Sequence, residues 1–165
     1  MRAIPDPGFS GDDGAADPGL GDALAAYAVD PDRRHAATLA VLQHTRLLVP
    51  VVAVLGEVEY DEQGLAHDKT SDMAAVLMRG RDGRTALLAF TGTEAMRRWN
   101  PEARPVPVPA AHAAEAALQD GAAAVLVDVA GPVMFVVEEE DLRELAAGHT
   151  LMDLNGRFGW VTPAR

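Results

Sequence analysis

The apolar run LLVPVVAVL, over residues 47–55, is the feature that most constrains how this chain can fold. A membrane-spanning helix needs about 20 apolar residues, so this run is too short to cross a bilayer. Its length and its valines are instead typical of a strand buried on both faces. Because Pro50 has no N–H to donate, we expect the strand to lie at a sheet edge or to carry a bulge there.

Strand and helix patterns alternate along the rest of the chain, which predicts a single α/β (α+β) domain. Besides 47–55, the expected strands cover residues 73–79, 84–90, 123–129 and 133–137. The expected helices cover residues 20–29, 31–44, 92–99, 110–119 and 139–147. We expect one central mixed sheet of about five strands, mostly antiparallel, with flanking helices. The helical crossover before residue 123 allows one parallel pair, formed by strands 84–90 and 123–129.

Two terminal segments flank the predicted domain of residues 20–148. Residues 1–19 are rich in Pro, Gly and Asp and predict an irregular arm. We expect the apolar Ile4 and Phe9 to dock in a groove of the domain or of a second copy, while the aspartates stay in water. Residues 149–165 form an extension in which an Asn-Gly pair favours a short hairpin, and Trp160 is a candidate anchor for a partner.

Composition narrows the classes of function. The chain has no cysteine, which excludes thiolate nucleophiles, thiolate metal ligands and disulfides. Its formal net charge is −11 and its basic residues are scattered, so we expect it to bind neither nucleic acid nor membranes. Residues 1–20 lack the apolar block of a secretory signal, and we therefore expect a cytoplasmic protein.

Five segments resemble the N-terminal domain of the SseB family, the enhanced serine sensitivity proteins, in the form found in high-GC Gram-positive bacteria. They are IPDPGFSGDDGAADP (4–18), LLVPVVAVLGE (47–57), KTSDMAAV (69–76), FTGTEAMRRWNPEARPVPV (90–108) and DGAAAVLVDVAGPV (120–133). Together they cover most of residues 4–148, whereas residues 149–165 lie outside the resemblance. The resemblance implies an α/β fold and a bacterial cytoplasmic protein. It implies no active site, because the family has no established biochemical activity.

The tetrapeptide Thr91-Gly92-Thr93-Glu94 follows a predicted strand and opens a predicted helix. Glycine there would let an anionic ligand approach free backbone N–H groups. The same residues fit a capping box, with Thr91 as N-cap and Glu94 at the third helical position, which would occupy those donors. Thr91 and Thr93 are therefore either ligand-binding residues or parts of a helix cap.

The stretch Lys69-Thr70-Ser71-Asp72 holds the only lysine of the chain next to hydroxyl and acidic side chains. It is either a contact site beside a strand or a solvated loop closed by local hydrogen bonds. Trp99, at the end of a predicted helix, is expected to cap the core and completes the candidate binding residues. We predict no catalytic residue, metal site or cofactor, since no G-x-S-x-G elbow or H-x-x-x-H pair occurs.

Two hypotheses of function remain. The first is a non-enzymatic binding or regulatory module that acts through a protein partner or self-association. The alternative is a small-molecule-binding domain or enzyme that uses a pocket near Lys69, Asp72 and Thr91. The two differ in a geometric requirement, because the alternative needs these three residues to converge on one concave site.

Overall fold

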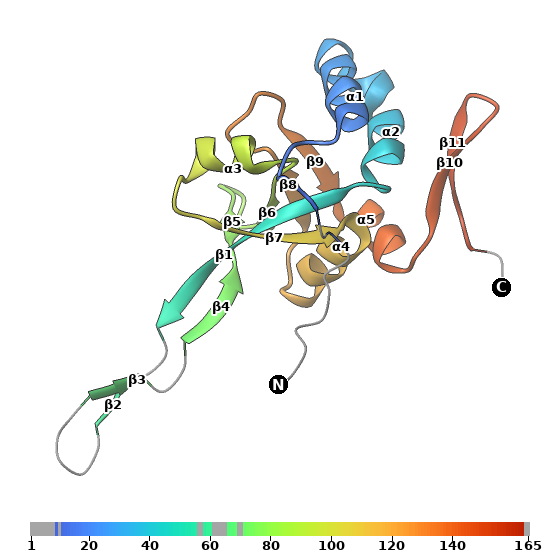
Figure 1. Cartoon of the computed structure of the whole chain (residues 1–165). Coiled ribbons are helices and arrows are strands. Elements are labelled where there is room, and N and C mark those ends of the chain that lie inside the picture. The colour runs from blue at the N-terminus through green and yellow to red at the C-terminus, as the bar shows by residue number, and fades with distance from the viewer. Residues whose placement is uncertain (1–8, 10, 56–57, 61–65, 69–70, 164–165) are drawn as a thin grey trace.

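The computed structural model describes residues 9, 11–55, 58–60, 66–68 and 71–163, and for 52–55, 58–60, 66–68 and 71–74 it describes the backbone alone. Its helices are α1 (Pro18–Val29), α2 (Pro31–Leu42), α3 (Thr93–Trp99), α4 (Ala110–Gln119) and α5 (Glu139–Ala146) (Figure 1). The predicted helices are confirmed to within two residues. Asp17 caps α1 by accepting from the backbone N–H of Leu20, and proline occupies the first turn of both α1 and α2.

A four-stranded mixed sheet forms the centre of the fold. Its strands are β5 (Leu77–Arg79), β6 (Thr85–Ala89), β8 (Ala124–Val127) and β9 (Phe135–Glu138), in that spatial order. The predicted parallel pair is confirmed, since β6 and β8 run side by side in parallel, and the two outer pairs are antiparallel. The α+β class and the mixed, mostly antiparallel pairing are therefore as expected.

The run at residues 47–55 belongs to a second sheet rather than to one shared sheet. Strand β1 (Arg46–Leu55) lies between β4 (Ser71–Ala75) and β7 (Arg104–Pro109), antiparallel to both. A single bridge between Leu48 and Phe90 joins this sheet to β6. The expected strand 73–79 is consequently divided at Val76, because its first half pairs with β1 and its second half with β6.

Prolines occur in this second sheet without breaking it. Leu48 directs its N–H and C=O toward Phe90, so Pro50, two residues on, directs its missing donor to that same side. At Pro50, β1 has passed its bridge with Phe90, and its pairing with β4 begins only at the next residue, Val51. The expectation of an edge strand at Pro50 is wrong, because β1 is central, but the missing N–H falls at the seam between two neighbours.

Strand β7 is not among the strands expected from the sequence. Its prolines, at positions 105, 107 and 109, face Pro50, Leu48 and Arg46, which direct their hydrogen-bonding groups away from β7. All three missing donors therefore point to the open edge of the sheet. Proline at every second position is compatible with one edge strand, and it also blunts that edge against further pairing.

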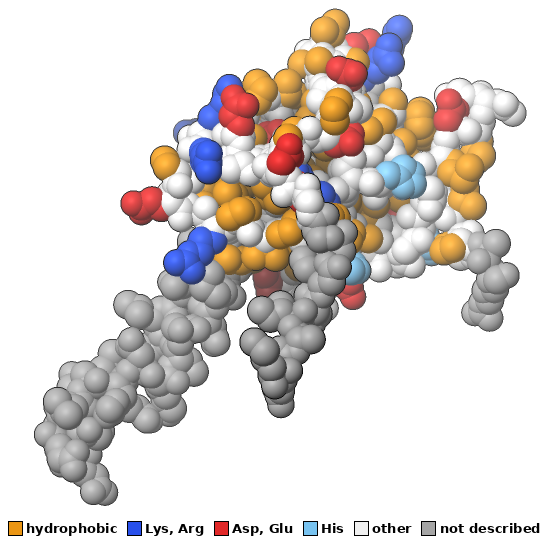
Figure 2. All heavy atoms as spheres, viewed as in Figure 1, with side chains coloured by type: hydrophobic (Ala, Val, Ile, Leu, Met, Phe, Trp, Pro, Cys, Tyr) orange, Lys and Arg blue, Asp and Glu red, His pale blue; other side chains and the backbone are white. Residues whose placement is uncertain are grey.

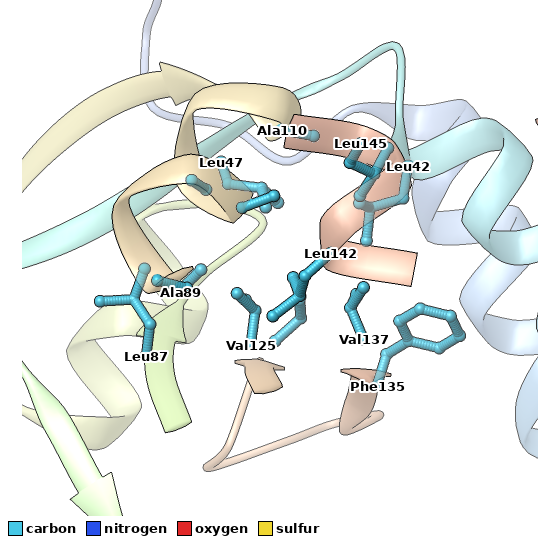
Figure 3. Close-up of a cluster of buried hydrophobic side chains, with 14 of the residues drawn as sticks. Leu42, Leu47, Leu87, Ala89, Ala110, Val125, Phe135, Val137, Leu142 and Leu145 are labelled. Carbon is cyan, nitrogen blue, oxygen red and sulfur yellow. The ribbon is translucent and has the colours of Figure 1, made fainter. Parts of the chain in front are cut away.

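The core lies on both faces of the four-stranded sheet. On one face, Leu87, Val125 and Val137 pack against Leu142 and Leu145 of α5 and the alanines of α4 (Figure 3). On the other face, Leu88 and Phe90 form a smaller cluster with Ala95 and Met96 of α3. Side chains alternate between the two faces along each strand, so β6 contributes to both clusters.

The terminal segments differ from each other. The described arm, residue 9 and residues 11–17, has no helix or strand, as predicted. The extension forms the predicted hairpin, β10 (Thr150–Leu154) and β11 (Arg157–Val161), which stands at one side of the molecule (Figure 1). Asn155 and Gly156 both have positive φ, as a tight two-residue turn requires. A second small hairpin, β2 (Val58–Tyr60) with β3 (Ala66–Asp68), lies in the segment between β1 and β4.

The described helices include no segment that is long and apolar enough to span a membrane.

Candidate functional site

Thr91 lies just beyond β6 and makes a different contact from the one predicted. Its backbone N–H donates to Asp128 Oδ1 at 2.9 Å, and its hydroxyl donates to Asp128 Oδ2 at 2.8 Å. The N-cap residue of α3 is Gly92, and no side chain caps this helix. The predicted capping box is therefore wrong, because the hydroxyl of Thr91 is engaged by a carboxylate 37 positions away, and Glu94 faces solvent beside Arg98.

Asp128 lies just beyond β8, opposite Thr91. The parallel register pairs Ala89 with Val127, so the residues that follow these two strands meet at the same edge of the sheet. The Asp128 N–H also donates to the carbonyl of Ala89, and its φ of 55° is one that aspartate adopts more readily than most residues. Asp128 was not singled out by sequence. The signal that could have found it is its position at the carboxyl end of a strand parallel to β6.

Burial governs the electrostatics of this carboxyl. Asp128 is 2% exposed, and desolvation raises its pKa above the usual aspartate value, while the two hydrogen bonds from Thr91 act in the opposite direction. Among the described ion pairs, none includes Asp128. The site thus contains a buried acidic group with hydrogen-bond donors but no cationic partner in the described part of the chain.

The arm passes directly over the loop that carries Thr91. The N–H of Thr93 donates to the carbonyl of Gly14 at 2.7 Å. A Cβ on Gly92 would lie 2.7 Å from the backbone nitrogen of Ala16 and 2.9 Å from the Gly14 oxygen, so only glycine allows the arm to approach this closely. Gly14 has φ near +81°, and a Cβ there would meet the hydroxyl of Thr93. Arm and loop therefore fit together backbone to backbone.

Arg46, the first residue of β1, fastens this arrangement. Its guanidinium donates to both carboxylate oxygens of Asp12, at 2.6 and 2.9 Å, and to the carbonyls of Ala15 and Thr91. The hydrogen bond from Arg46 lowers the pKa of Asp12 to about 2, helped by the backbone N–H of Gly14. The arm's aspartates were expected to stay in water, and Asp13 and Asp17 are exposed, although Asp17 also caps α1. The Asp12 side chain departs from the expectation, because it is 20% exposed and pairs with Arg46.

Of the two arm residues expected to dock on the domain, Phe9 and Ile4, the structure describes only Phe9. Phe9 is partly buried and lines a hollow of about 310 Å³ together with Leu48, Pro105 and Pro107, on the outer side of the arm. Ile4 lies outside the described residues. The described arm is therefore held mainly by polar contacts, with an apolar contribution at Phe9.

A cleft of about 490 Å³ opens between the arm, α1 and α3, with Thr91 and Asp128 among its lining residues. Most of its other lining residues are small or apolar, and they are Gly14, Ala15, Ala16, Gly21, Leu24, Ala25, Gly92, Ala95, Pro132 and Val133. Glu94 and Arg98 complete the lining, with the Glu94 side chain 88% exposed. The cleft is hence an apolar space with one buried carboxyl and a charged pair that reaches solvent.

Another hollow of about 490 Å³ lies between the arm and residues 44–46. It is bordered by Phe9, His44 and the arm's aspartates, and its basic group, Arg46, is already engaged by Asp12. A fourth space, of about 180 Å³, lies over the strands β5, β6, β8 and β9. Of these spaces, only the cleft between α1 and α3 has buried polar side chains at its base, and for that reason it is the candidate site.

The predicted binding residues do not gather in this cleft. Thr91 lines it, whereas Thr93 lines the hollow beside Phe9, and Trp99 packs on Phe90 with ring centroids 5.7 Å apart, in the smaller core cluster. Lys69 and Thr70 lie outside the described residues. Ser71 and Asp72 belong to β4, where their backbones pair with Leu55 and Val54, and their side chains are not described.

The distance along β1 separates the two predicted groups. Asp72 pairs with Val54, whereas the loop of Thr91 begins next to the bridge at Leu48, six residues away. At about 3.3 Å per residue, these backbone positions are roughly 20 Å apart. The register thus does not bring Asp72 and Thr91 to one pocket. What each group binds remains a prediction.

Within the described residues, no three His, Asp or Glu side chains are grouped as a metal site would require. A family model described as SseB protein N-terminal domain matches residues 20–144. The match includes α1 from residue 20 onward, Thr91, α3 and Asp128, and excludes the arm and the C-terminal hairpin. No curated protein and no solved structure matches the chain.

Proposed function

We propose that this chain, which belongs to the SseB protein N-terminal domain family, is a non-enzymatic binding module whose ligand site is the cleft between α1 and α3. The observation that carries the proposal is the position of the cleft. It lies outside the carboxyl ends of β6 and β8, the parallel pair of the sheet. In open α/β sheets, ligands bind in the crevice outside the carboxyl ends of the strands. The family resemblance supports the bacterial cytoplasm as its proposed compartment.

The polar groups at the base of the cleft support binding rather than turnover. The hydroxyl of Thr91 donates a hydrogen bond to Asp128, and the same carboxylate accepts a second one from the backbone N–H of Thr91. Both side chains are thereby engaged in fixing the loops after β6 and β8. Side chains that fix the walls of a site keep its shape constant. A ligand-binding or regulatory module needs such a preformed site.

The alternative, an enzyme with a pocket near Lys69, Asp72 and Thr91, loses support from the register of β1 and β4. Asp72 pairs with Val54 and the Thr91 loop begins beside Leu48, and these two positions on β1 are roughly 20 Å apart, which is more than one small pocket spans. The small-molecule part of the alternative persists in the cleft itself, where Thr91 contributes without Asp72.

The binding proposal is tested with two matched variants on α1. Ala25 lines the cleft, whereas Ala28, on the same helix, does not, and both are exposed. Trp at position 25 would fill the cleft, while Trp at position 28 would extend into solvent. In a thermal-shift screen of amino acids and nucleotides, we expect at least one compound to raise the melting temperature of the wild type and of Ala28→Trp, but not of Ala25→Trp. A panel without stabilising compounds, or equal stabilisation of both variants, would contradict the proposal.

A second candidate function, self-association, is favoured by the C-terminal hairpin. Met152 and Leu154 are 47% and 53% exposed and Phe158 is 37% exposed, and apolar side chains gather on this hairpin in Figure 2. Because Leu151 directs its N–H and C=O to Gln43, Phe158 and Trp160 direct theirs to the outer edge of β11. Antiparallel pairing of β11 with β11 of a second copy would satisfy both edges and cover the apolar surface.

A further inference from the structure

We infer that the cleft receives a small molecule with a protonated amine, and that the ammonium group pairs with the carboxylate of Asp128. The inference rests on the proposed function, since it names the ligand class of that same cleft. Three properties of the described residues carry it. They are the burial of Asp128, its spare hydrogen-bonding capacity, and the character of the other groups around it.

Charge complementarity is the main argument. Asp128 is 2% exposed, and the contacts that it accepts come from the uncharged N–H and O–H groups of Thr91. A buried carboxylate is costly unless it is paired with a cation or neutralised by a proton. Desolvation raises the pKa of Asp128, which reflects this cost. A ligand ammonium would supply the counter-charge that the described residues do not.

The carboxylate also has room for another donor. An ionised carboxylate has about four acceptor positions, and Thr91 occupies one on each oxygen. Asp128 lines the cleft, so a ligand ammonium there would take one of the acceptor positions that Thr91 leaves. An ammonium group, with three N–H donors, matches a carboxylate that has acceptor positions left and no partner among the described ion pairs.

The nearby charged groups do not compete for this position. Arg46 reaches the carbonyl of Thr91, but Asp12 engages its guanidinium through two hydrogen bonds. Arg98 lines the cleft and pairs with Glu94 at 3.4 Å, where both side chains are at least half exposed. Arg98 therefore lies on the solvent side of the cleft, whereas Asp128, which has no ion partner among the described residues, lies buried.

The walls define the rest of the ligand. Glycine or alanine lines the cleft from the arm, from α1 and from α3, which leaves the volume of about 490 Å³ open. Leu24 and Val133 add apolar surface. A compact apolar body attached to a primary amine fits both the buried carboxylate and the apolar walls.

The test compares benzylamine with benzyl alcohol, which has nearly the same shape but no charge at neutral pH. Their affinities are measured by NMR titration for the wild type, Asp128→Asn, Ala25→Trp and Ala28→Trp. Asn at position 128 retains an oxygen for the Thr91 N–H and removes the charge. We expect benzylamine to bind the wild type at least about tenfold more tightly than benzyl alcohol, and to lose that advantage in Asp128→Asn. Ala25→Trp should weaken both probes, and Ala28→Trp neither.

The outcomes separate the inference from the proposed function. Equal affinities of the two probes for the wild type, or no binding of benzylamine at millimolar concentration, would overturn the amine inference without requiring any variant to fold. An unchanged benzylamine affinity in Asp128→Asn would overturn it as well. If benzyl alcohol alone binds and Ala25→Trp blocks it, the cleft remains a binding site and only the ligand class is wrong. Binding of both probes that Ala25→Trp leaves unchanged would contradict the cleft itself.

Discussion

The arm and the C-terminal hairpin both lie outside the matched family domain, yet they attach to it in opposite ways. The described arm has no regular structure and is held by polar contacts, above all those of Arg46 with Asp12, Ala15 and Thr91. The hairpin is regular, and its inner half packs apolar Leu151 and Trp160 against the core. The comparison teaches that regular structure and firm attachment are separate properties.

The hairpin is attached at its base only. Gln43, which follows α2, uses both ends of its amide to pair with the backbone of Leu151, as a neighbouring strand would. The side chain of Trp160 packs against the core, and His149 contacts Glu144 of α5. Beyond these contacts the outer half, with Met152 and Leu154, extends into solvent. The arm, by contrast, is fastened along its described length and forms a wall of the cleft.

The largest effect that we expect comes from Arg46→Ala. This substitution removes the partner of Asp12 and two carbonyl contacts, at a site where the Arg46 side chain is 11% exposed. We expect the free energy of unfolding to fall by about 3 kcal/mol, as when a largely buried ion pair loses one member. Chemical denaturation measures the loss, and hydrogen exchange at the Thr93 N–H, which donates to Gly14, reports release of the arm. Arg33→Ala, at an exposed ion pair, is the control and should change stability little.

Two glycine substitutions test the backbone fit of the arm against the looser packing of the hairpin. In Gly92→Ala the new methyl meets the backbone of Gly14 and Ala16, which cannot move without displacing the arm, so we expect a loss of about 2 kcal/mol. In Gly159→Ala, on β11, the methyl meets only the end of the Leu154 side chain at 3.2 Å, which can rotate away. We expect that variant to remain within about 0.5 kcal/mol of the wild type. Equal losses in thermal or chemical denaturation would show that the arm is no more tightly fitted than the hairpin.

Gln43→Ala tests the base of the hairpin. It removes two hydrogen bonds to Leu151, and we expect a loss of about 1 to 2 kcal/mol. The loss should be local, so hydrogen exchange should accelerate in β10 and β11 and remain unchanged at Thr93, beside the arm. Gln119→Ala, at the exposed end of α4, is the matched control. Faster exchange at Thr93 would indicate that hairpin and arm are coupled, against the comparison.

Sequence patterns predicted the elements of this molecule better than their partners. The five helices follow local signals, such as the Asp-Pro pair at Asp30 and the apolar spacing that follows it, and they were placed correctly. Strand β7 was missed, because proline usually argues against a strand and its compatibility depends on which side pairs. The division at Val76 could not be predicted either, since it depends on where β1 and β6 meet in space.

Of the candidate site, the sequence analysis named Thr91 but neither Asp128 nor the hydrogen bonds that join the two residues. Thr91 was selected for a local reason, its place between a predicted strand and a predicted helix, where it would bind a ligand or cap the helix. Its hydroxyl instead donates to Asp128, far along the chain. The arm's role was missed on similar grounds, because its sequence favours an irregular segment and gives no sign of Arg46 as a partner. Contacts between residues distant in sequence follow from strand register, and composition and spacing do not report them.

The smallest change in stability, and the sharpest test of the hairpin's free half, is expected from Phe158→Lys. Phe158 is on β11, its backbone groups point to the open edge, and its side chain is already 37% exposed, so stability should change by less than about 0.5 kcal/mol. A lysine at that edge would oppose the antiparallel pairing of two copies, as charged edge residues do in other sheets. We expect the wild type to show a dimer by light scattering as concentration rises, and Phe158→Lys to remain a monomer. Met134→Lys, at an apolar residue that is 48% exposed between β8 and β9, should associate as the wild type does. A wild type that stays monomeric would contradict self-association through the hairpin. Loss of the dimer in both variants would indicate an effect of net charge alone.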